Sequence, residues 1–272
     1  MRSRGSRDEN GLQGWFTDRL GDYRGKHGRR LIGWDEILEG GLPRTASVMS
    51  WRGVDGAIAA AKQDHDVVLA PAGWMYFDNH QSDRADEPSG RLALLDLKRA
   101  YGFEPMDASL TPEQARHVLG TEATLWTEFI PSQRHVQHAL FPRLDAMSEI
   151  AWSPRDAKNW DSFLQRLPAQ LRRYSVQDII PSDTAFAPGI HVQEDVPIVL
   201  RSGKATVSLD NQTGFGTLRY TTDGSEPGVN AAAYTAPFPV TLPVTVRAAT
   251  FAPDESVIAA ARSRRIDRDT LL

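Results

Sequence analysis

The sequence predicts an α/β fold in which about four βα units form a parallel sheet and a small antiparallel β-sandwich follows. Up to about Ser175, short apolar runs alternate with segments of helical spacing, as expected for βα units. Beyond about Pro188, short β-rich segments alternate with turns, which favours a sandwich. The chain has 272 residues, 40% of them hydrophobic, so it can form two domains with sizeable cores.

The elements of the first region follow from hydrophobic spacing. Apolar runs predict strands over 29–34, 46–51, 66–70 and 118–126. Helical periodicity or an alanine-rich composition predicts helices over 12–24, 54–63, 133–150 and 160–174, with a kink or boundary at Pro142. The polar segment 77–112 is predicted to be an insertion between the third and fourth strands, with a helix over 92–101.

The second region is predicted to contain strands over 205–209, 217–222 and 244–251, with a turn cluster over 221–227. We place the boundary between the two regions within 181–189. The tail after Ala261 is charged, and we expect it to be frayed.

Composition excludes several classes of function. Lys and Arg number 31 against 35 for Asp and Glu, a net charge of −4, so nucleic acid is not an expected partner. The absence of cysteine excludes disulfides, thiolate metal sites and cysteine nucleophiles. No apolar run approaches the roughly 20 residues of a membrane span. The basic segment 1–7 has no apolar stretch after it, so it does not fit a signal peptide, and the compartment stays open.

Aromatic residues and carboxylates recur where the predicted strands end. The ends carry Gly33-Trp34-Asp35-Glu36, Ser50-Trp51-Arg52-Gly53, Trp74-Met75-Tyr76-Phe77-Asp78 and Leu125-Trp126-Thr127-Glu128. In a (β/α)₈ barrel the active site lies at this end of the strands. Flat rings beside carboxylates suit a sugar, whose C–H faces stack and whose hydroxyls need partners. A single tryptophan at a strand end is more often core packing, but four strands with the same ending favour a sugar site.

These motifs resemble those of the family 20 glycoside hydrolases, the β-N-acetylhexosaminidases, over about residues 12–174. The segment Leu218–Pro227 is similar to the β-sandwich domain of chitobiase-like members. The resemblance implies that residues 1–180 form the C-terminal half of a (β/α)₈ TIM barrel, equivalent to strands five to eight, and that residues 188–272 form the chitobiase-type β-sandwich domain.

The resemblance also implies roles for individual residues. Trp34, Trp51 and Trp126 would wall the pocket for a terminal N-acetylhexosamine of an oligosaccharide. Tyr76 would donate a hydrogen bond to the acetamido carbonyl and help to stabilise an oxazolinium intermediate, and Asp78 and Glu128 would hold sugar hydroxyls. The family uses substrate-assisted retaining hydrolysis, in which an enzyme Asp orients the acetamido group and the adjacent Glu protonates the leaving oxygen. It implies no cofactor and no metal, and a pair such as His135 and His138 is better explained without one.

The chain departs from the family pattern at the catalytic Asp-Glu pair, which would follow a His-x-Gly-Gly signature. The adjacent Asp-Glu pairs of this sequence begin at Asp8, Asp35, Asp86 and Asp254, and none has that context. We therefore expect the chain to be the C-terminal portion of a longer hydrolase and to be inactive alone. The alternative is a non-catalytic carbohydrate-binding or scaffolding remnant. A half-barrel exposes unpaired strand edges, so two copies could also pair as a homodimer. Family members are often periplasmic, secreted or lysosomal, but nothing in this chain directs export.

Overall fold

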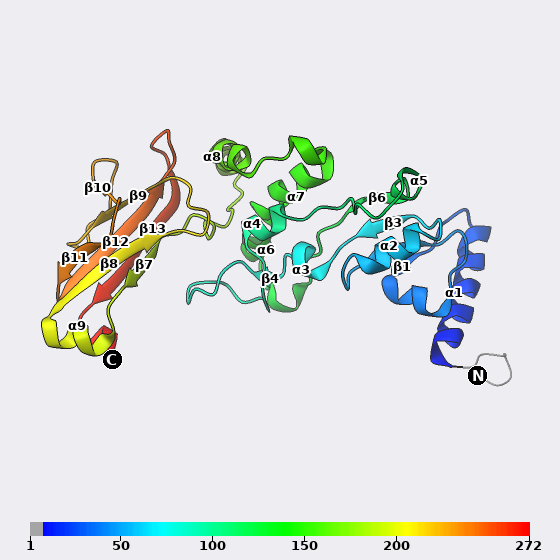
Figure 1. Ribbon diagram of the computed structural model, residues 1–272, viewed down its shortest axis with the longest axis horizontal. Coiled ribbons are helices and arrows are strands. Elements are labelled where there is room, and N and C mark those ends of the chain that lie inside the picture. Colours follow the sequence, from blue (N-terminus) through cyan, green and yellow to red (C-terminus); the bar gives the residue numbers. More distant parts are fainter. Residues whose placement is uncertain (1–7) are drawn as a thin grey trace. The chain divides into compact units, whose positions relative to one another are not determined.

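The computed structural model describes residues 8–272 (Figure 1). The basic segment 1–7 considered above lies outside the described residues. Contacts divide the chain into two compact units. The first comprises residues up to 80 and 88–159, and the second comprises 81–87 and 160–272.

The first unit is built on a four-stranded parallel sheet in the order β1-β2-β3-β6, which confirms the predicted α/β architecture. Its strands are short: β1 (Ile32–Trp34), β2 (Ser47–Ser50), β3 (Val67–Leu69) and β6 (Val118–Thr121). Strand β6 is shorter than the predicted segment 118–126. The register aligns Trp34 with Met49, and Ser50 with Leu69, so the ends of neighbouring strands lie level.

One face of the sheet packs against the helix α2 (Asp55–Ala61). Val48, Val67 and Leu69 form a buried cluster with Ala57 and Ala60 of this helix. Burying apolar surface stabilises a fold by about 25 cal/mol per Å², and this burial is the main stabilisation of a sheet with such short strands. The crossover from β2 through α2 to β3 is the predicted βα unit.

Helix α1 (Glu9–Lys26) begins at Asp8, whose side chain accepts a hydrogen bond from the Gly11 amide at 2.8 Å. It contacts the 3₁₀ helix η2 (Asp35–Gly40), which directly follows β1. The two backbones meet at glycines, since a Cβ on Gly14 would lie 1.8 Å from the Gly40 carbonyl oxygen. This close contact fixes the segment that carries Asp35 and Glu36.

The insertion differs from the sequence prediction. Residues 92–101 do not form one helix: β5 (Arg91–Leu94) pairs with β4 (Asn79–His80), and α4 (Leu97–Tyr101) follows. Asp96 caps α4 by accepting the Arg99 amide at 2.7 Å, so the helix begins there and the residues before it are free to pair. Two short helices flank the insertion, α3 (Ala72–Met75) and α5 (Pro112–Ala115).

The helices after β6 break at Pro142, as predicted. They are η3 (Thr127–Phe129), α6 (Gln133–Leu140), α7 (Arg143–Trp152) and η4 (Arg155–Ala157). Arg143, the first residue of α7, is fully buried. Its guanidinium donates hydrogen bonds to the carbonyls of Phe77, Asn79 and Leu95 and to that of Ala139. A buried cation thus ties β4 and the residue that directly follows β5 to α7.

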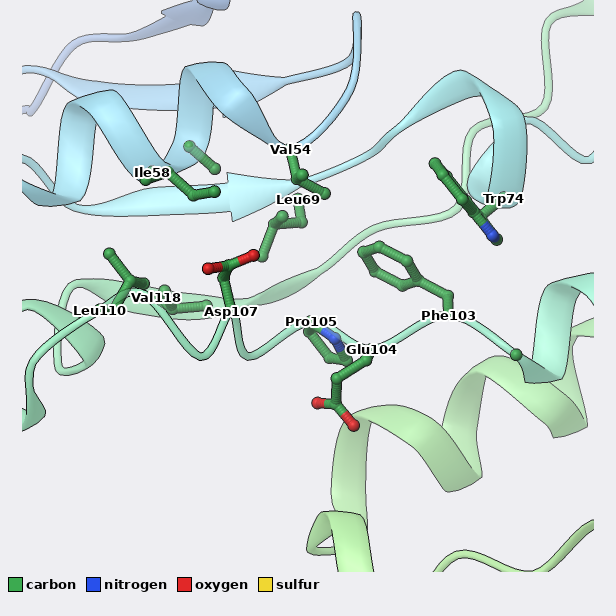
Figure 2. A pocket seen from close by; sticks show the side chains of 12 residues that line it. Val54, Ile58, Leu69, Trp74, Phe103, Glu104, Pro105, Asp107, Leu110 and Val118 are labelled. Atoms are coloured by element: carbon green, nitrogen blue, oxygen red, sulfur yellow. The ribbon is translucent and has the colours of Figure 1, made fainter.

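A cavity of about 160 Å³ lies in the first unit between α2, the sheet and segment 102–110 (Figure 2). Apolar side chains such as Ile58, Leu69 and Phe103 line much of it, and Trp74 closes one side. Trp74 belongs to one of the aromatic strand ends of the sequence, but its ring packs 5.8 Å from that of Phe103. Trp74 is therefore a packing residue of this cavity.

The second unit contains the expected antiparallel sandwich. One sheet has the order β10-β9-β12-β13 and the other β11-β8-β7. The strands are β7 (Gly189–Val192), β8 (Lys204–Asp210), β9 (Thr217–Thr221), β10 (Ala232–Ala233), β11 (Phe238–Thr241), β12 (Val244–Phe251) and β13 (Val257–Ile266). Val207 of one sheet and Val246, Ala248 and Ile266 of the other share one buried core. The helices of this unit are α8 (Trp160–Val176), α9 (Val196–Ser202) and α10 (Arg268–Leu271).

The prediction of a frayed tail after Ala261 is wrong. Residues 262–266 of this tail belong to β13, the longest strand of the sandwich, and pair with β12 from Val244 to Ala248. The charges that suggested fraying have partners: Arg262 bonds Asp183 at 2.9 Å and Arg264 donates to the Ile190 carbonyl. Among the helices of residues 8–272, none combines the length and the apolar character that a membrane crossing needs.

Candidate active site

The backbone brings Tyr76 next to Trp126. Beyond β3 and β6 the two segments meet again, because the Phe77 amide donates to the Thr124 carbonyl and the Thr124 amide to the Met75 carbonyl, each at 2.9 Å. Tyr76 therefore lies beside the segment that leads to Trp126, at the carboxyl edge of the sheet, where Trp34 and Trp51 follow β1 and β2.

These residues line a hollow of about 330 Å³, which we call the aromatic hollow. Its lining consists of Trp34, Glu36, Trp51, Tyr76, Arg91, Trp126 and Glu128. The volume falls within the range of small-molecule sites. Five of the six site residues predicted from the sequence therefore come together, and Asp78 does not line the hollow.

The rings form a continuous wall. Trp51 and Tyr76 are stacked, with centroids 6.2 Å apart and planes inclined by 21°. Trp126 lies 6.5 Å from Tyr76 and 6.2 Å from Trp34, at tilted angles. Such a wall offers flat apolar faces to a ligand with C–H surfaces.

The carboxylates at the strand ends have different tasks. Asp35 is buried and accepts hydrogen bonds from the Arg52 guanidinium at 2.7 Å, the Ser50 hydroxyl and the Trp51 amide. Its charge therefore fixes the turn that carries Trp51. Glu36 accepts the indole N–H of Trp51 at 2.9 Å and orients that ring in the hollow.

Asp78 and Glu128 also differ. Glu128 is exposed in the hollow. The Asp78 carboxylate is 0% exposed, and its Oδ2 accepts a hydrogen bond from Arg91 Nε at 2.6 Å. Its other oxygen, Oδ1, is buried without a hydrogen-bond partner among the described residues. The charged group that Asp78 presents to the hollow is thus the guanidinium of Arg91.

The phenol of Tyr76 is held in its protonated form. Burial raises the pKa of Tyr76 above its ordinary value, and a hydrogen bond with Trp126 and the charge of Arg91 oppose this only in part. A neutral phenol keeps its O–H and can donate a hydrogen bond in the hollow.

Sequence reasoning missed Glu36 and Arg91 as lining residues. Glu36 has a visible signal, because it lies two residues after Trp34 at a strand end. No sequence signal marks Arg91, because only the pairing of β4 with β5 brings this residue of the insertion to the hollow. Within residues 8–272, no group of three or more His, Cys, Asp or Glu side chains is placed to hold a metal ion.

The family model described as "Glycosyl hydrolase family 20, catalytic domain" matches residues 1–155, more than half of the chain. The chain belongs to glycosyl hydrolase family 20. A second model, "Chitobiase/beta-hexosaminidase C-terminal domain", matches residues 201–258 within the sandwich. The resemblance inferred from the four motifs and from the Leu218–Pro227 segment is confirmed.

Curated relatives are named as β-hexosaminidases. A beta-hexosaminidase of Porphyromonas gingivalis is 36% identical over 241 residues, which is 87% of this chain and 30% of that protein. A beta-N-acetylhexosaminidase of Cellulomonas fimi is 30% identical over 145 residues, 52% of this chain and 29% of that protein. The family 20 chain thus spans about a third or less of the length of these relatives.

Solved structures agree on the fold. The family 20 exo-β-N-acetylglucosaminidase of Vibrio harveyi, solved with N-acetylglucosamine, is similar with a TM-score of 0.62 and 31% identity, over 66% of this chain and 29% of that one. A β-N-acetylhexosaminidase of Bacteroides fragilis, at 20% identity and a TM-score of 0.58, supports the fold alone. The parallel sheet of the first unit is a partial TIM barrel, as predicted, and a β-domain follows it.

Proposed function

We propose that this family 20 chain contributes the sugar-binding wall of an enzyme that hydrolyses terminal β-linked N-acetylhexosamine residues from oligosaccharides. The observation that carries the proposal is the aromatic hollow, where three indoles and a phenol from four strand ends meet beside carboxylates. The names of the relatives, all β-hexosaminidases, support the same substrate class.

The hollow suits an N-acetylated hexose. Trp34, Trp51 and Trp126 offer faces for the sugar ring and the acetamido methyl group. The Tyr76 phenol, which burial keeps protonated, donates to the acetamido carbonyl oxygen. The exposed carboxylate of Glu128 accepts hydrogen bonds from hydroxyls.

The reaction proceeds with retention in this proposal. The acetamido oxygen attacks the anomeric carbon, the glycosidic C–O bond breaks, and an acid protonates the leaving oxygen. Water then attacks the anomeric carbon and restores the acetamido group. A hydrogen bond from Tyr76 to the acetamido oxygen orients that oxygen for attack, because it fixes one end of the group against the wall.

The acid and the orienting Asp are not supplied by the adjacent Asp-Glu pairs in residues 8–272. Asp8 caps α1, Asp35 is bonded to Arg52, Asp86 bonds Arg262 and Asp254 bonds Arg172. Glu36 is engaged with the Trp51 indole. We infer that this 272-residue chain binds the sugar and turns over substrate poorly or not at all.

The test combines binding and turnover on the same preparation. N-acetylglucosamine is titrated against tryptophan fluorescence, and a chromogenic N-acetyl-β-glucosaminide is used for turnover. Trp51→Ala should weaken binding by about tenfold to a hundredfold, because a buried aromatic contact contributes about 1.5–3 kcal/mol. Trp152→Ala is the matched control, since Trp152 is exposed and lies outside the hollow. The proposal is overturned if the folded chain does not bind N-acetylglucosamine, or if Trp51→Ala leaves its affinity unchanged.

The second candidate, a non-catalytic carbohydrate-binding remnant, is favoured by the engagement of Asp35 and Glu36 in structural bonds. Binding without turnover in any longer form of the protein would support it. Robust turnover by this 272-residue chain would contradict the inference of low activity. Pairing of two copies through the edges of β1 and β6 stays a prediction, which light scattering tests directly.

A further inference from the structure

Arg91 reaches the aromatic hollow from the polar insertion. Strand β5 pairs with β4 in the register Asn79↔Arg91, and the Arg91 amide donates to the Asp78 carbonyl at 2.8 Å. This pairing fixes the backbone of Arg91 opposite Asn79, which follows Tyr76 by three residues.

One side of the Arg91 guanidinium is anchored. Its Nε donates to Asp78 Oδ2 at 2.6 Å, and the Asp78 side chain is 0% exposed while that of Arg91 is 42% exposed. A carboxylate shielded from water holds its cation more firmly than a surface carboxylate does. The guanidinium carbon lies 5.5 Å from the centroid of the Tyr76 ring, inside cation–π range.

The other side of the guanidinium is available. Neither Nη atom of Arg91 has a hydrogen bond within the part of the chain that the structure describes, and Arg91 is one of the residues lining the hollow. An anchored guanidinium with Nη donors to spare is preorganised for a ligand oxygen, because little side-chain entropy is left to lose.

We propose that Arg91 is a sugar-binding residue, whose Nη groups donate to one hydroxyl oxygen of the terminal N-acetylhexosamine, and that Asp78 is its positioning residue. The inference rests on the proposed function and deepens it. Glu36 and Glu128, the other charged residues of the hollow, can only accept. A sugar hydroxyl that donates its proton to a carboxylate can still accept a hydrogen bond through its oxygen lone pairs, and the Nη groups of Arg91 can donate that bond.

The charges of the hollow also define the substrate class. The hollow is lined by the carboxylates of Glu36 and Glu128 and by one guanidinium, that of Arg91, whose charge is offset by the buried Asp78 carboxylate, so the local balance is negative. The ligand that fits is a neutral hexosamine with free hydroxyls. A sulfated or carboxylated sugar should bind more weakly than its neutral parent.

The experiment measures the dissociation constants of N-acetylglucosamine and of its 3-, 4- and 6-deoxy analogues by fluorescence titration. Arg91→Met should weaken binding of the parent sugar by about tenfold to a hundredfold, as expected for a hydrogen bond to a charged group. It should leave unchanged the affinity for the one analogue that lacks the contacted hydroxyl. Arg91→Lys should restore part of the loss.

Arg99→Met is the matched control. Arg99 belongs to the same insertion and lies over a tryptophan, with its guanidinium carbon 5.9 Å from the Trp74 ring, but it does not line the hollow. Its substitution should leave every dissociation constant within twofold of the original.

Arg91→Met leaves the buried Asp78 charge without its partner and could disturb folding. The double variant Asp78→Asn/Arg91→Met removes both charges and should show the same selective loss. Asp78→Asn alone should weaken binding of the parent sugar but not binding of the deoxy analogue that lacks the contacted hydroxyl. A merely structural defect would weaken binding of both.

The outcomes separate the two proposals. If the original chain and Arg99→Met bind while Arg91→Met binds equally well, Arg91 is not a sugar-binding residue and the proposed function stands. If Arg91→Met weakens all deoxy analogues to the same extent, the contact with one hydroxyl is refuted. If the folded original chain does not bind the sugar at all, both proposals fall.

Discussion

Replacing Arg143 with methionine should destabilise the first unit by about 3–5 kcal/mol, the usual cost of deleting one partner of a buried charged network. Arg143 is fully buried and donates to the carbonyls of four residues, Phe77, Asn79, Leu95 and Ala139. A buried carbonyl left without a donor costs about 1–3 kcal/mol, so the three carbonyls of Phe77, Asn79 and Leu95, which lie far from Arg143 in sequence, would together cost about 3–9 kcal/mol. Removing the desolvation cost of the buried guanidinium offsets part of this, which brings the expected value to the lower half of that range.

Urea denaturation followed by tryptophan fluorescence measures the effect. Six of the seven tryptophans lie in the first unit and only Trp160 lies in the second, so the signal reports mainly the unit that contains Arg143. Arg143→Lys keeps the charge but replaces the planar fork by one ammonium, and it should lose about 1–3 kcal/mol. Arg134→Met, on the exposed side of α6, is the control and should stay within about 0.5 kcal/mol of the original.

The reasoning is refuted if Arg143→Met unfolds at the same urea concentration as the original chain. It is also refuted in part if Arg143→Lys is as stable as the original, because the fork geometry would then be irrelevant. Sugar affinity gives a second reading. The Phe77 and Asn79 carbonyls flank Asp78, so Arg143→Lys should weaken sugar binding through the Asp78–Arg91 pair even where the unit stays folded.

Three further predictions concern single groups of the first unit. Burial raises the pKa of Tyr76, so the absorbance titration difference between the original chain and Tyr76→Phe should have its midpoint above the ordinary value of about 10, and a midpoint at or below it would contradict the buried phenol. A hydrogen bond with His117 lowers the pKa of Asp66, so the stability that Asp66 contributes is present above its ordinary pKa of about 3.9 and is lost as the pH falls through the lowered pKa. The difference in urea midpoint between the original chain and Asp66→Asn should therefore persist at neutral pH and vanish in acid. Asp35→Asn should lower the free energy of unfolding by about 1–3 kcal/mol in urea denaturation, and it should weaken sugar binding because Asp35 fixes the turn that carries Trp51. Unchanged sugar binding would show that this turn keeps its conformation without the Asp35 carboxylate.

The parallel sheet and the aromatic wall could be predicted because their signals are local. An apolar run followed by Trp34 or Trp51 marks both a buried strand and its carboxyl end, and neighbouring parallel strands then bring these ends together. Tyr76 and Trp126 follow the same rule, although the bridge between Tyr76 and Thr124 that sets their spacing is not visible in the sequence.

The tail and the insertion could not be predicted, because their structure depends on pairing over long distances. Residues 262–265 carry three arginines, which suggest an exposed end when taken alone. In the structure they lie in β13, where Arg262 donates to the carboxylates of Asp183 and Asp86, which are far away in sequence. Helical spacing over 92–101 likewise predicts one helix, but the carbonyls of Asp78 and His80 accept the amides of Arg91 and Leu95, and the cap at Asp96 starts the helix only at Leu97.

The direction of a carboxylate is the finest detail that the sequence leaves open, and here it changes the chemistry of the hollow. Asp78 follows Tyr76 by two residues, so its place beside the wall could be expected, but the sequence does not say whether it faces a ligand or a cation. The pairing of β4 with β5 puts Arg91 against it, and the carbonyl bonds of Arg143 hold β4 and the residue that directly follows β5. Two arginines, one buried and one half-exposed, therefore connect α7 to the hollow through backbone and charge. The polar insertion then serves to position the Arg91 guanidinium, which donates hydrogen bonds to the sugar. The affinities of Arg91 variants for the deoxy sugars test this role.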